Sequence, residues 1–201
     1  MNNYPLNPNL KPFWGWEMRN DSLMYKYAEG RVLYGGRASS KTHEYGGAAA
    51  KIAAEHKTRF LCVRRFQNKI KESVYTVLKN KINDLGLTGF DVQASNIYHD
   101  NGSDFTFYGI ERNVDEIRSF ENCDILWIEE AHNLTKTQWE TLDPTIRKQG
   151  SEVWISFNPS LISDFIWQKF IVNTPKGFLV RHINYDENPY LSQTMLNKIN
   201  E

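Results

Sequence analysis

The sequence predicts an α/β fold with a mainly parallel central sheet flanked by helices. From Arg31 onward, short apolar runs alternate with longer helical patterns, which is the order that parallel strands joined by crossover helices require. Residues 125–128 and 153–155 are apolar at every position, as strands buried on both faces are. The 201 residues, 40% of them hydrophobic, fit one domain with a sizeable core.

The elements follow in a regular order along the chain. Strands are expected at residues 31–36, 59–65, 124–131, 151–159 and 177–185, and helices at residues 41–55, 70–86, 113–120, 135–148 and 164–170. Gly86 ends the second helix, and Pro144 breaks the fourth. Three shorter extended pieces, at residues 90–94, 96–100 and 104–110, are linked by an Asn101-Gly102 hairpin signal and predict an antiparallel flap.

The chain divides into an arm, residues 1–30, and a main domain, residues 31–201. The start of the arm is rich in Asn and Pro and carries Phe13, Trp14 and Trp16. Because large aromatic side chains gain most when they are buried, we expect the arm to pack on the body.

Composition excludes several classes of protein. No run approaches the roughly 18 apolar residues that span a bilayer, and the first residues lack the features of a leader, so we expect a cytoplasmic protein with no membrane partner.

Cys62 and Cys123 lie in apolar runs and are expected to be buried thiols. The formal net charge is zero, so any nucleic-acid contact must be local. The densest basic stretch, residues 64–71, reads more simply as a solvated loop and helix start.

The stretch GGRASSKT, residues 35–42, resembles a phosphate-binding loop in which Ser40 replaces the last glycine. It follows a strand and opens a helix, whose N-terminus favours an anion. Lys41 would reach the terminal phosphates and Thr42 would bind Mg²⁺. The alternative is a Gly/Ser-rich turn that caps a helix with a surface lysine. The expected nucleotide-binding residues are Gly35, Gly36, Arg37, Ala38, Ser39, Ser40, Lys41 and Thr42.

Two acidic residues end the apolar strand at residues 125–128. Strand ends at this edge of an α/β sheet are where ligands bind. Adjacent side chains on a strand point apart, so Glu129 is expected to reach the Mg²⁺ shell and Glu130 to polarise the attacking water. The alternative is a pair of charges at a helix N-terminus.

The next apolar strand ends in Ser156 and Asn158, whose polar side chains are candidates for sensing the γ-phosphate. Arg37, inside the loop, is a catalytic candidate because a guanidinium there would neutralise charge that develops in the transition state. The alternative for Arg37 is an ordinary ion pair with Glu129, Glu130 or a neighbouring loop.

Taken in order, these motifs resemble the ATPase domain of the large terminase subunit of tailed bacteriophages. The resemblance runs from about Pro12 to Leu191 and includes DILWIEEAHNLTKTQWETLDPTIRK, EVWISFNP and INYDENPYL. It implies a P-loop NTPase fold of the ASCE, RecA-like type and a motor that hydrolyses ATP to move double-stranded DNA into a preformed capsid.

The resemblance also implies cofactors, partners and further site residues. ATP and Mg²⁺ would be bound, and the partners would be double-stranded DNA, the portal protein and the small terminase subunit. The motor would be a homo-oligomeric ring in the host cytoplasm, docked transiently on the procapsid; the isolated domain would be monomeric. Phe13 and Trp14 lie where the family places residues near the adenine, with Tyr34 or Arg65 as alternatives. The candidates for an arginine acting on a neighbouring subunit are Arg147 and Arg118.

The sequence departs from this family at two points. Ser40 puts normal nucleotide affinity in doubt, and no nuclease domain follows the ATPase motifs, so we expect an excised domain without nuclease activity. Two rival functions remain. The string Glu129-Glu130-Ala131-His132 is one residue from the D-E-A-H box of helicases, and a nucleotide-gated scaffold with little turnover would tolerate Ser40.

Overall fold

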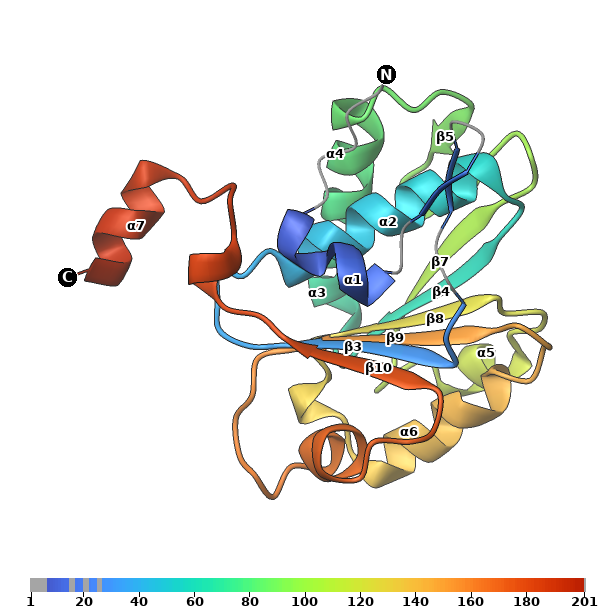
Figure 1. Cartoon of the computed structure of the whole chain (residues 1–201). Helices are drawn as coiled ribbons and strands as arrows, with labels where there is room; N and C mark the ends of the chain where they lie inside the picture. Colours follow the sequence, from blue (N-terminus) through green and yellow to red (C-terminus); the bar gives the residue numbers. More distant parts are fainter. Residues whose placement is uncertain (1–6, 15–16, 20–21, 25–26, 201) are drawn as a thin grey trace.

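The computed structural model describes residues 7–14, 17–19, 22–24 and 27–200, and its main body is a sheet between two layers of helices (Figure 1). The eight-stranded sheet has the order β10-β3-β9-β8-β4-β7-β6-β5, and the first six of these strands run parallel. Its strands are β3 (Gly30–Tyr34), β4 (Arg59–Arg64), β5 (Phe90–Val92), β6 (Asn96–His99), β7 (Asp104–Gly109), β8 (Ile125–Glu129), β9 (Glu152–Phe157) and β10 (Phe178–His182). The predicted α/β fold with a mainly parallel sheet is confirmed.

Helices cover both faces of the sheet. One face carries α1 (Lys11–Trp14), α2 (Lys41–Glu55), α3 (Gln67–Ile70), the π-helical turn Lys71–Tyr75 and α4 (Thr76–Asp84). The other carries α5 (Val114–Ser119), α6 (Lys136–Leu142) and the π-helical segment Trp167–Val172. Short 3-10 turns lie at Pro8–Leu10, Ala131–Asn133, Asp143–Thr145 and Tyr185–Glu187, and a separate antiparallel pair is formed by β1 (Glu17–Arg19) and β2 (Ser22–Met24). Helix α7 (Gln193–Asn200) stands away from the body (Figure 1).

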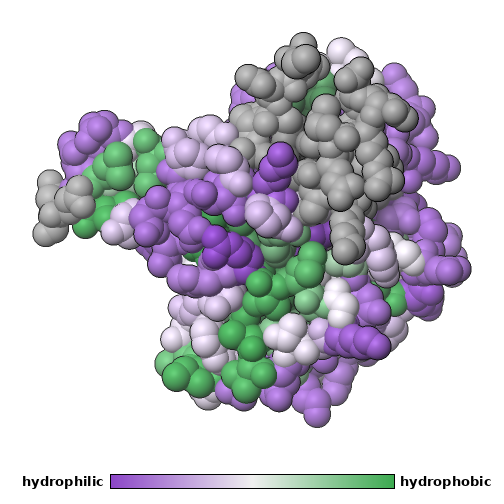
Figure 2. Space-filling view, viewed as in Figure 1, coloured by the Kyte–Doolittle hydropathy of each residue, from purple (hydrophilic) through white to green (hydrophobic). Residues whose placement is uncertain are grey.

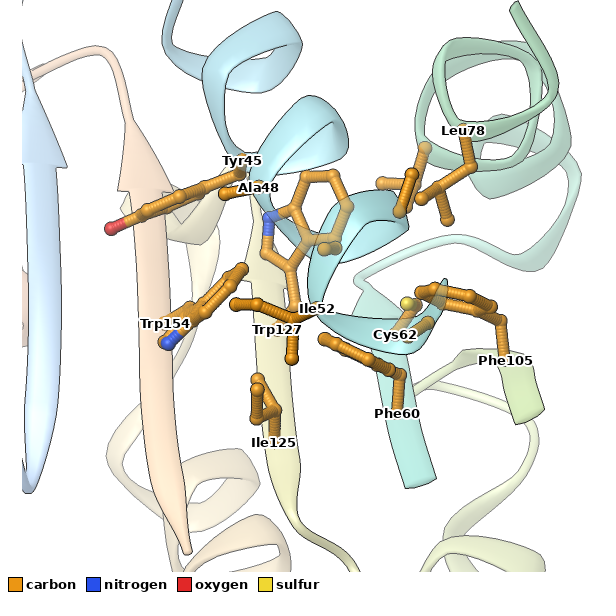
Figure 3. Close-up of a cluster of buried hydrophobic side chains, with 14 of the residues drawn as sticks. Tyr45, Ala48, Ile52, Phe60, Cys62, Leu78, Phe105, Ile125, Trp127 and Trp154 are labelled. Carbon is orange, nitrogen blue, oxygen red and sulfur yellow. The ribbon is translucent and has the colours of Figure 1, made fainter. Parts of the chain in front are cut away.

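The two central strands, β8 and β9, are buried along their whole length. Because successive side chains point to opposite faces, each strand contributes side chains to the hydrophobic clusters on both faces of the sheet. Trp127 and Trp154 lie beneath α2 beside Tyr45 and Phe60 (Figure 3), and residues 128 and 155 enter the opposite cluster. Burying side chains of this size stabilises the fold by roughly 2–3 kcal/mol each. The candidate site residues lie at the carboxyl ends of these strands, Glu129 and Ser156 within them and Glu130 and Asn158 just after.

The Asn101-Gly102 turn joins β6 and β7 as predicted, with Gly102 at φ +89°. Strand β5 pairs antiparallel with β6, and β6 pairs antiparallel with β7. The antiparallel pairing predicted for these pieces is confirmed, but they do not stand apart as a flap, because β7 also pairs in parallel with β4 and continues the central sheet. Phe105, stacked on Phe60 at 4.4 Å between ring centroids, supplies the reason: the outer strands extend the hydrophobic core.

The described part of the arm packs beside β3, the strand that carries Arg31. Trp14 is fully buried and Phe13 is 7% exposed. The buried Arg31 side chain lies 5.2 Å from the Trp14 ring, donates to the Phe13 carbonyl at 2.7 Å and pairs with buried Glu152 at 3.1 Å. Trp16 lies outside the described residues, and the division into residues 1–30 and 31–201 stays a prediction.

Both cysteines are free and buried, as predicted. Burial raises the pKa of Cys123 to about 12 and that of Cys62 well above its usual value. Thiols held protonated in this way are weak nucleophiles, so neither side chain is a reactive centre.

Among the coloured residues in Figure 2 most are hydrophilic, and the hydrophobic ones gather in the lower half of the view and on α7 at the left. Two of the most exposed hydrophobic side chains, Leu161 and Ile162, lie in the loop that follows β9. Among the described helices, none combines the length and the apolar character needed to cross a membrane.

Candidate functional site

The loop between β3 and α2 forms a tight turn at the carboxyl edge of the sheet. Gly35 has φ +148°, and a Cβ atom at this position would lie 1.9 Å from the Ile183 carbonyl oxygen. Only glycine therefore fits there. The Gly35 N–H donates to the Phe157 carbonyl at 3.3 Å, which ties the loop to the end of β9.

The loop presents a row of unpaired backbone donors. The N–H groups of residues 37–43 have no hydrogen-bond acceptor within the part of the chain that the structure describes. They lie at the N-terminus of the 15-residue helix α2, where the helix dipole adds positive potential. An anion such as a phosphate is the ligand that this arrangement favours.

A cavity of about 300 Å³ collects most of the predicted site. It is lined by Arg37, Ala38, Ser39, Ser40, Lys41, Thr42, His43, Glu129, Glu130, Phe157 and Asn158. Two larger cavities, of about 880 and 490 Å³, contain no residue of the loop or of the strand that ends in Glu129. The chemistry of the lining, and not the volume of the cavity, makes this cavity the candidate site.

The Lys41 ammonium group lies on the loop itself. It donates to the carbonyls of Gly35 at 3.0 Å and Gly36 at 2.8 Å and to the Ser39 hydroxyl at 2.8 Å. Burial lowers the pKa of Lys41 to about 8, while nearby Glu129 opposes that shift. The loop therefore holds a largely charged amine beside its unpaired N–H groups, as a phosphate site requires.

A second contact joins the loop to the acidic strand. The Thr42 hydroxyl donates to one Glu129 oxygen at 2.6 Å, and the Ser156 hydroxyl donates to the other. Burial raises the pKa of Glu129, and these two hydrogen bonds oppose the rise. A hydroxyl and a carboxylate at this separation are hard oxygen donors of the kind that bind Mg²⁺ together with substrate phosphates and water. The donor set fits the predicted ion.

Glu130 lines the same cavity as Glu129 but has a different partner. Its backbone is left-handed, at φ +51°, and its half-exposed carboxylate forms an ion pair with Arg64 at the end of β4. Arg64 also donates to the Lys69 carbonyl and the Ser73 hydroxyl, both at 3.1 Å. The sequence alone gave no reason to place Arg64 at this site. Arg64 reaches Glu130 because β4 pairs directly with β8, and the order of the strands would have indicated this contact.

Arg37 lines the cavity and is exposed. It makes no hydrogen bond or ion pair with any described residue, so the alternative of a pair with Glu129 or Glu130 is not observed. Asn158 lines the same cavity, whereas Ser156 is buried against Glu129. The catalytic role of Arg37 and the sensor roles stay predictions.

Several other predicted residues lie outside this cavity. Phe13 and Trp14 are buried in the core, Tyr34 packs against Phe157 and Trp167, and Arg65 pairs with Glu111. The adenine contact stays a prediction, and the burial of Trp14 means that it could act there only after a rearrangement.

The arginine candidates and the basic stretch also lie apart from the cavity. Arg118 is exposed at the end of α5, and Arg147 lines the 490 Å³ cavity beside Ser151, which precedes β9. Both lie near the amino ends of the strands, so any action of theirs on a phosphate would have to be on another subunit. In the stretch 64–71 the side chains of Arg64, Arg65 and Lys69 pair with glutamates, which leaves little free charge for DNA.

Ser40 occupies a backbone conformation that glycine adopts more easily. Its φ is +65°, and its hydroxyl is shielded from solvent and has no partner among the described residues. Left-handed backbone costs a residue with a Cβ atom about 1–2 kcal/mol. The loop therefore keeps its shape at a local cost, and the missing glycine does not abolish the turn.

Ser40→Gly is expected to stabilise the folded chain by about 1 kcal/mol, because relief of strain outweighs the added freedom of the unfolded chain. The melting temperature should rise by about 2–4 °C, measured by scanning calorimetry. Ser119→Gly, in helical backbone, is the matched control and should lower the melting temperature. A lower melting temperature for Ser40→Gly would show that the left-handed turn stores no strain.

Solved structures share this fold. The large terminase of a thermophilic bacteriophage, in complex with ADP, has a TM-score of 0.72 and 16% identity over 86% of this chain and 44% of its own. The Thermus phage P74-26 large terminase ATPase domain has a TM-score of 0.64 and 16% identity over 87% and 84%. The bacteriophage phi29 packaging motor assembly has a TM-score of 0.65 and 12% identity over 86% and 59%. The P-loop type of fold is thereby confirmed.

The chain spans less than half the length of the thermophilic bacteriophage terminase. No match to a curated protein was found. Residues 28–201, which include the loop at residues 35–42, Glu129, Glu130 and Asn158, match the family model described as phage terminase large subunit. The chain belongs to the phage terminase large subunit family.

Proposed function

We propose that this chain is the ATP-hydrolysing motor domain of a viral large terminase and drives double-stranded DNA into a preformed capsid. The observation that carries the proposal is the contact of Thr42 and Ser156 with the two oxygens of Glu129. It joins the phosphate loop, the acidic strand and the next strand at one point, with Glu130 directly beside it. The alternative interpretations, a turn that caps a helix and a pair of charges at a helix N-terminus, give no reason for these three segments to meet.

The loop residues would hold the triphosphate. The unpaired N–H groups of residues 37–43 would donate to phosphate oxygens, and the Lys41 ammonium would move from the loop carbonyls onto the terminal phosphates. Thr42 and Glu129 would hold Mg²⁺, which when bound neutralises phosphate charge. Arg37, free of partners among the described residues, would reach the phosphates from the exposed side.

The water-activating role falls to Glu130. Its carboxylate lines the cavity and is half exposed, so it can accept a hydrogen bond from water. Orientation of the attacking water by such a carboxylate is the usual protein contribution to this reaction. Ser156, bonded to Glu129, and Asn158, on the cavity wall, would report the state of the γ-phosphate to β9.

The proposed partners are double-stranded DNA, the portal protein, the small terminase subunit and further copies of this chain in a ring. In this role the chain would act in the host cytoplasm, docked transiently on the procapsid. Family membership and the likeness to a packaging motor assembly support these partners. With its ring neighbours absent, the chain would be a monomer that hydrolyses ATP slowly, because any arginine from a neighbouring subunit would be missing.

Purified chain is expected to release phosphate from ATP only when Mg²⁺ is present, measured in a coupled phosphate assay with and without linear double-stranded DNA. EDTA should reduce the rate to the blank. Tight binding of ATP without turnover would favour the nucleotide-gated scaffold, and ATP-dependent strand separation would favour the helicase. Either result would contradict the proposal.

A further inference from the structure

Two asparagines that follow β10 hold the phosphate loop from outside the cavity. The Asn184 side-chain oxygen accepts from the Gly36 N–H at 3.0 Å. The Asn188 side-chain amide donates to the Ala38 carbonyl at 2.7 Å. One asparagine thus acts as an acceptor and the other as a donor, and neither lines the cavity.

The first bond fixes the peptide plane between Gly35 and Gly36. In a trans peptide the C=O and the following N–H point in opposite directions. With the Gly36 N–H directed at Asn184, the Gly35 carbonyl faces the other side, where it accepts from the Lys41 ammonium at 3.0 Å. Asn184 therefore fixes the direction of the Gly35 carbonyl, which accepts a hydrogen bond from the Lys41 ammonium.

The second bond acts in the same way on the peptide between Ala38 and Ser39. Because the Ala38 carbonyl is directed at Asn188, the Ser39 N–H points away from Asn188, and it has no acceptor among the described residues. Ala38 is left-handed at φ +62°, a conformation that costs about 1–2 kcal/mol. A hydrogen bond to its carbonyl is a direct means of holding that conformation.

The segment that carries the asparagines is itself anchored. The Ile183 N–H donates to the Tyr34 carbonyl at 2.9 Å, which continues the β3–β10 pairing up to the loop. The Glu187 carbonyl accepts from the Asn7 side chain of the arm at 2.9 Å, and the Glu187 carboxylate pairs with Arg181 on β10. The asparagines are therefore held by the sheet on one side and by the arm on the other.

We propose that Asn184 and Asn188 are positioning residues that preset two peptide planes of the phosphate loop for nucleotide binding. The proposal rests on the proposed function, because it assigns the loop to a nucleotide. Since both side chains belong to the segment that leads from β10 toward α7, a displacement of that segment would turn the loop peptides out of their binding geometry.

The test uses alanine variants of the full chain and the analogue ATPγS. Asn184→Ala and Asn188→Ala should each raise the Kd for ATPγS by about tenfold, measured by titration calorimetry at least 15 °C below the melting temperature of each variant. In steady-state hydrolysis the KM should rise, with kcat at saturation within about twofold of the parent. Kd values within twofold of the parent for both variants would overturn the proposal.

A pair of aspartate variants tests the polarity of the two bonds. Both add one negative charge close to the same loop, but Asn184→Asp keeps an acceptor for Gly36, whereas Asn188→Asp sets an acceptor against the Ala38 carbonyl. Asn188→Asp should therefore bind ATPγS several-fold more weakly than Asn184→Asp, and equal affinities would overturn the proposal. The control is Asn173→Asp, which loses a 2.9 Å bond to the Gln168 carbonyl far along the chain from the loop and should bind like the parent.

Hydrogen exchange separates this proposal from the proposed function. Without nucleotide, Asn184→Ala should accelerate exchange of the Gly36 amide by at least tenfold, and Asn173→Asp should leave it unchanged. If the parent binds no ATPγS, the proposed function fails; the exchange result still decides whether Asn184 holds the loop. An unchanged Gly36 exchange rate would overturn the positioning role.

Discussion

Lys41→Ala is expected to weaken nucleotide binding by about 10- to 100-fold. A charge-assisted hydrogen bond contributes about 1.5–3 kcal/mol, and each 1.4 kcal/mol corresponds to a factor of ten in affinity. Lys41 also donates to Gly35, Gly36 and Ser39, so the variant loses the group that joins the two ends of the loop. Titration calorimetry with ATPγS and Mg²⁺ measures the change in Kd.

The matched control is Lys79→Ala, which removes an exposed lysine from α4, a helix on the same side of the sheet. It should bind ATPγS like the parent. Circular dichroism of both variants checks that the fold is kept. If Lys41→Ala retained the affinity of the parent, the cavity between Arg37 and Asn158 would not be a triphosphate site, whatever the resemblance of the loop.

Local chemistry made much of the fold and of the site predictable. The helix expected at residues 41–55 is observed as Lys41–Glu55, because a run rich in alanine follows a glycine turn. The wholly apolar runs before Glu129 and Ser156 required strands buried on both faces, and these are β8 and β9. Since parallel strands end at one edge, the polar residues that follow them had to converge.

The remaining features depend on which strands become neighbours. Arg64 meets Glu130 only because β4 lies beside β8, and spacing along the chain does not contain that order. Asn184 and Asn188 reach the loop only because β10 pairs with β3. Arg31, which lies beside the buried Trp14, likewise forms its ion pair with Glu152, 121 residues away. These contacts are long-range, so local patterns could not predict them.

Glu130→Ala is expected to reduce kcat for ATP hydrolysis by a factor of about 100 to 10,000, because general-base assistance contributes that much. The Kd for ATPγS should stay within about threefold of the parent, since the loop contacts and the Thr42–Glu129 contact do not involve Glu130. Single-turnover phosphate release measures the chemical step, and calorimetry measures binding. Glu130→Gln, which keeps the size of the side chain and a partner for Arg64, should show the same loss of kcat.

The matched control is Glu111→Ala, which breaks the neighbouring ion pair with Arg65 at a similar exposed position. It should retain the kcat of the parent, because Glu111 does not line the cavity. If Glu130→Gln and the parent hydrolysed ATP at equal rates, the water-activating role would be wrong. A loss of ATPγS binding in Glu130→Gln would instead show that the carboxylate contributes to nucleotide binding and not to the chemical step. The two measurements together separate catalysis from binding at Glu130.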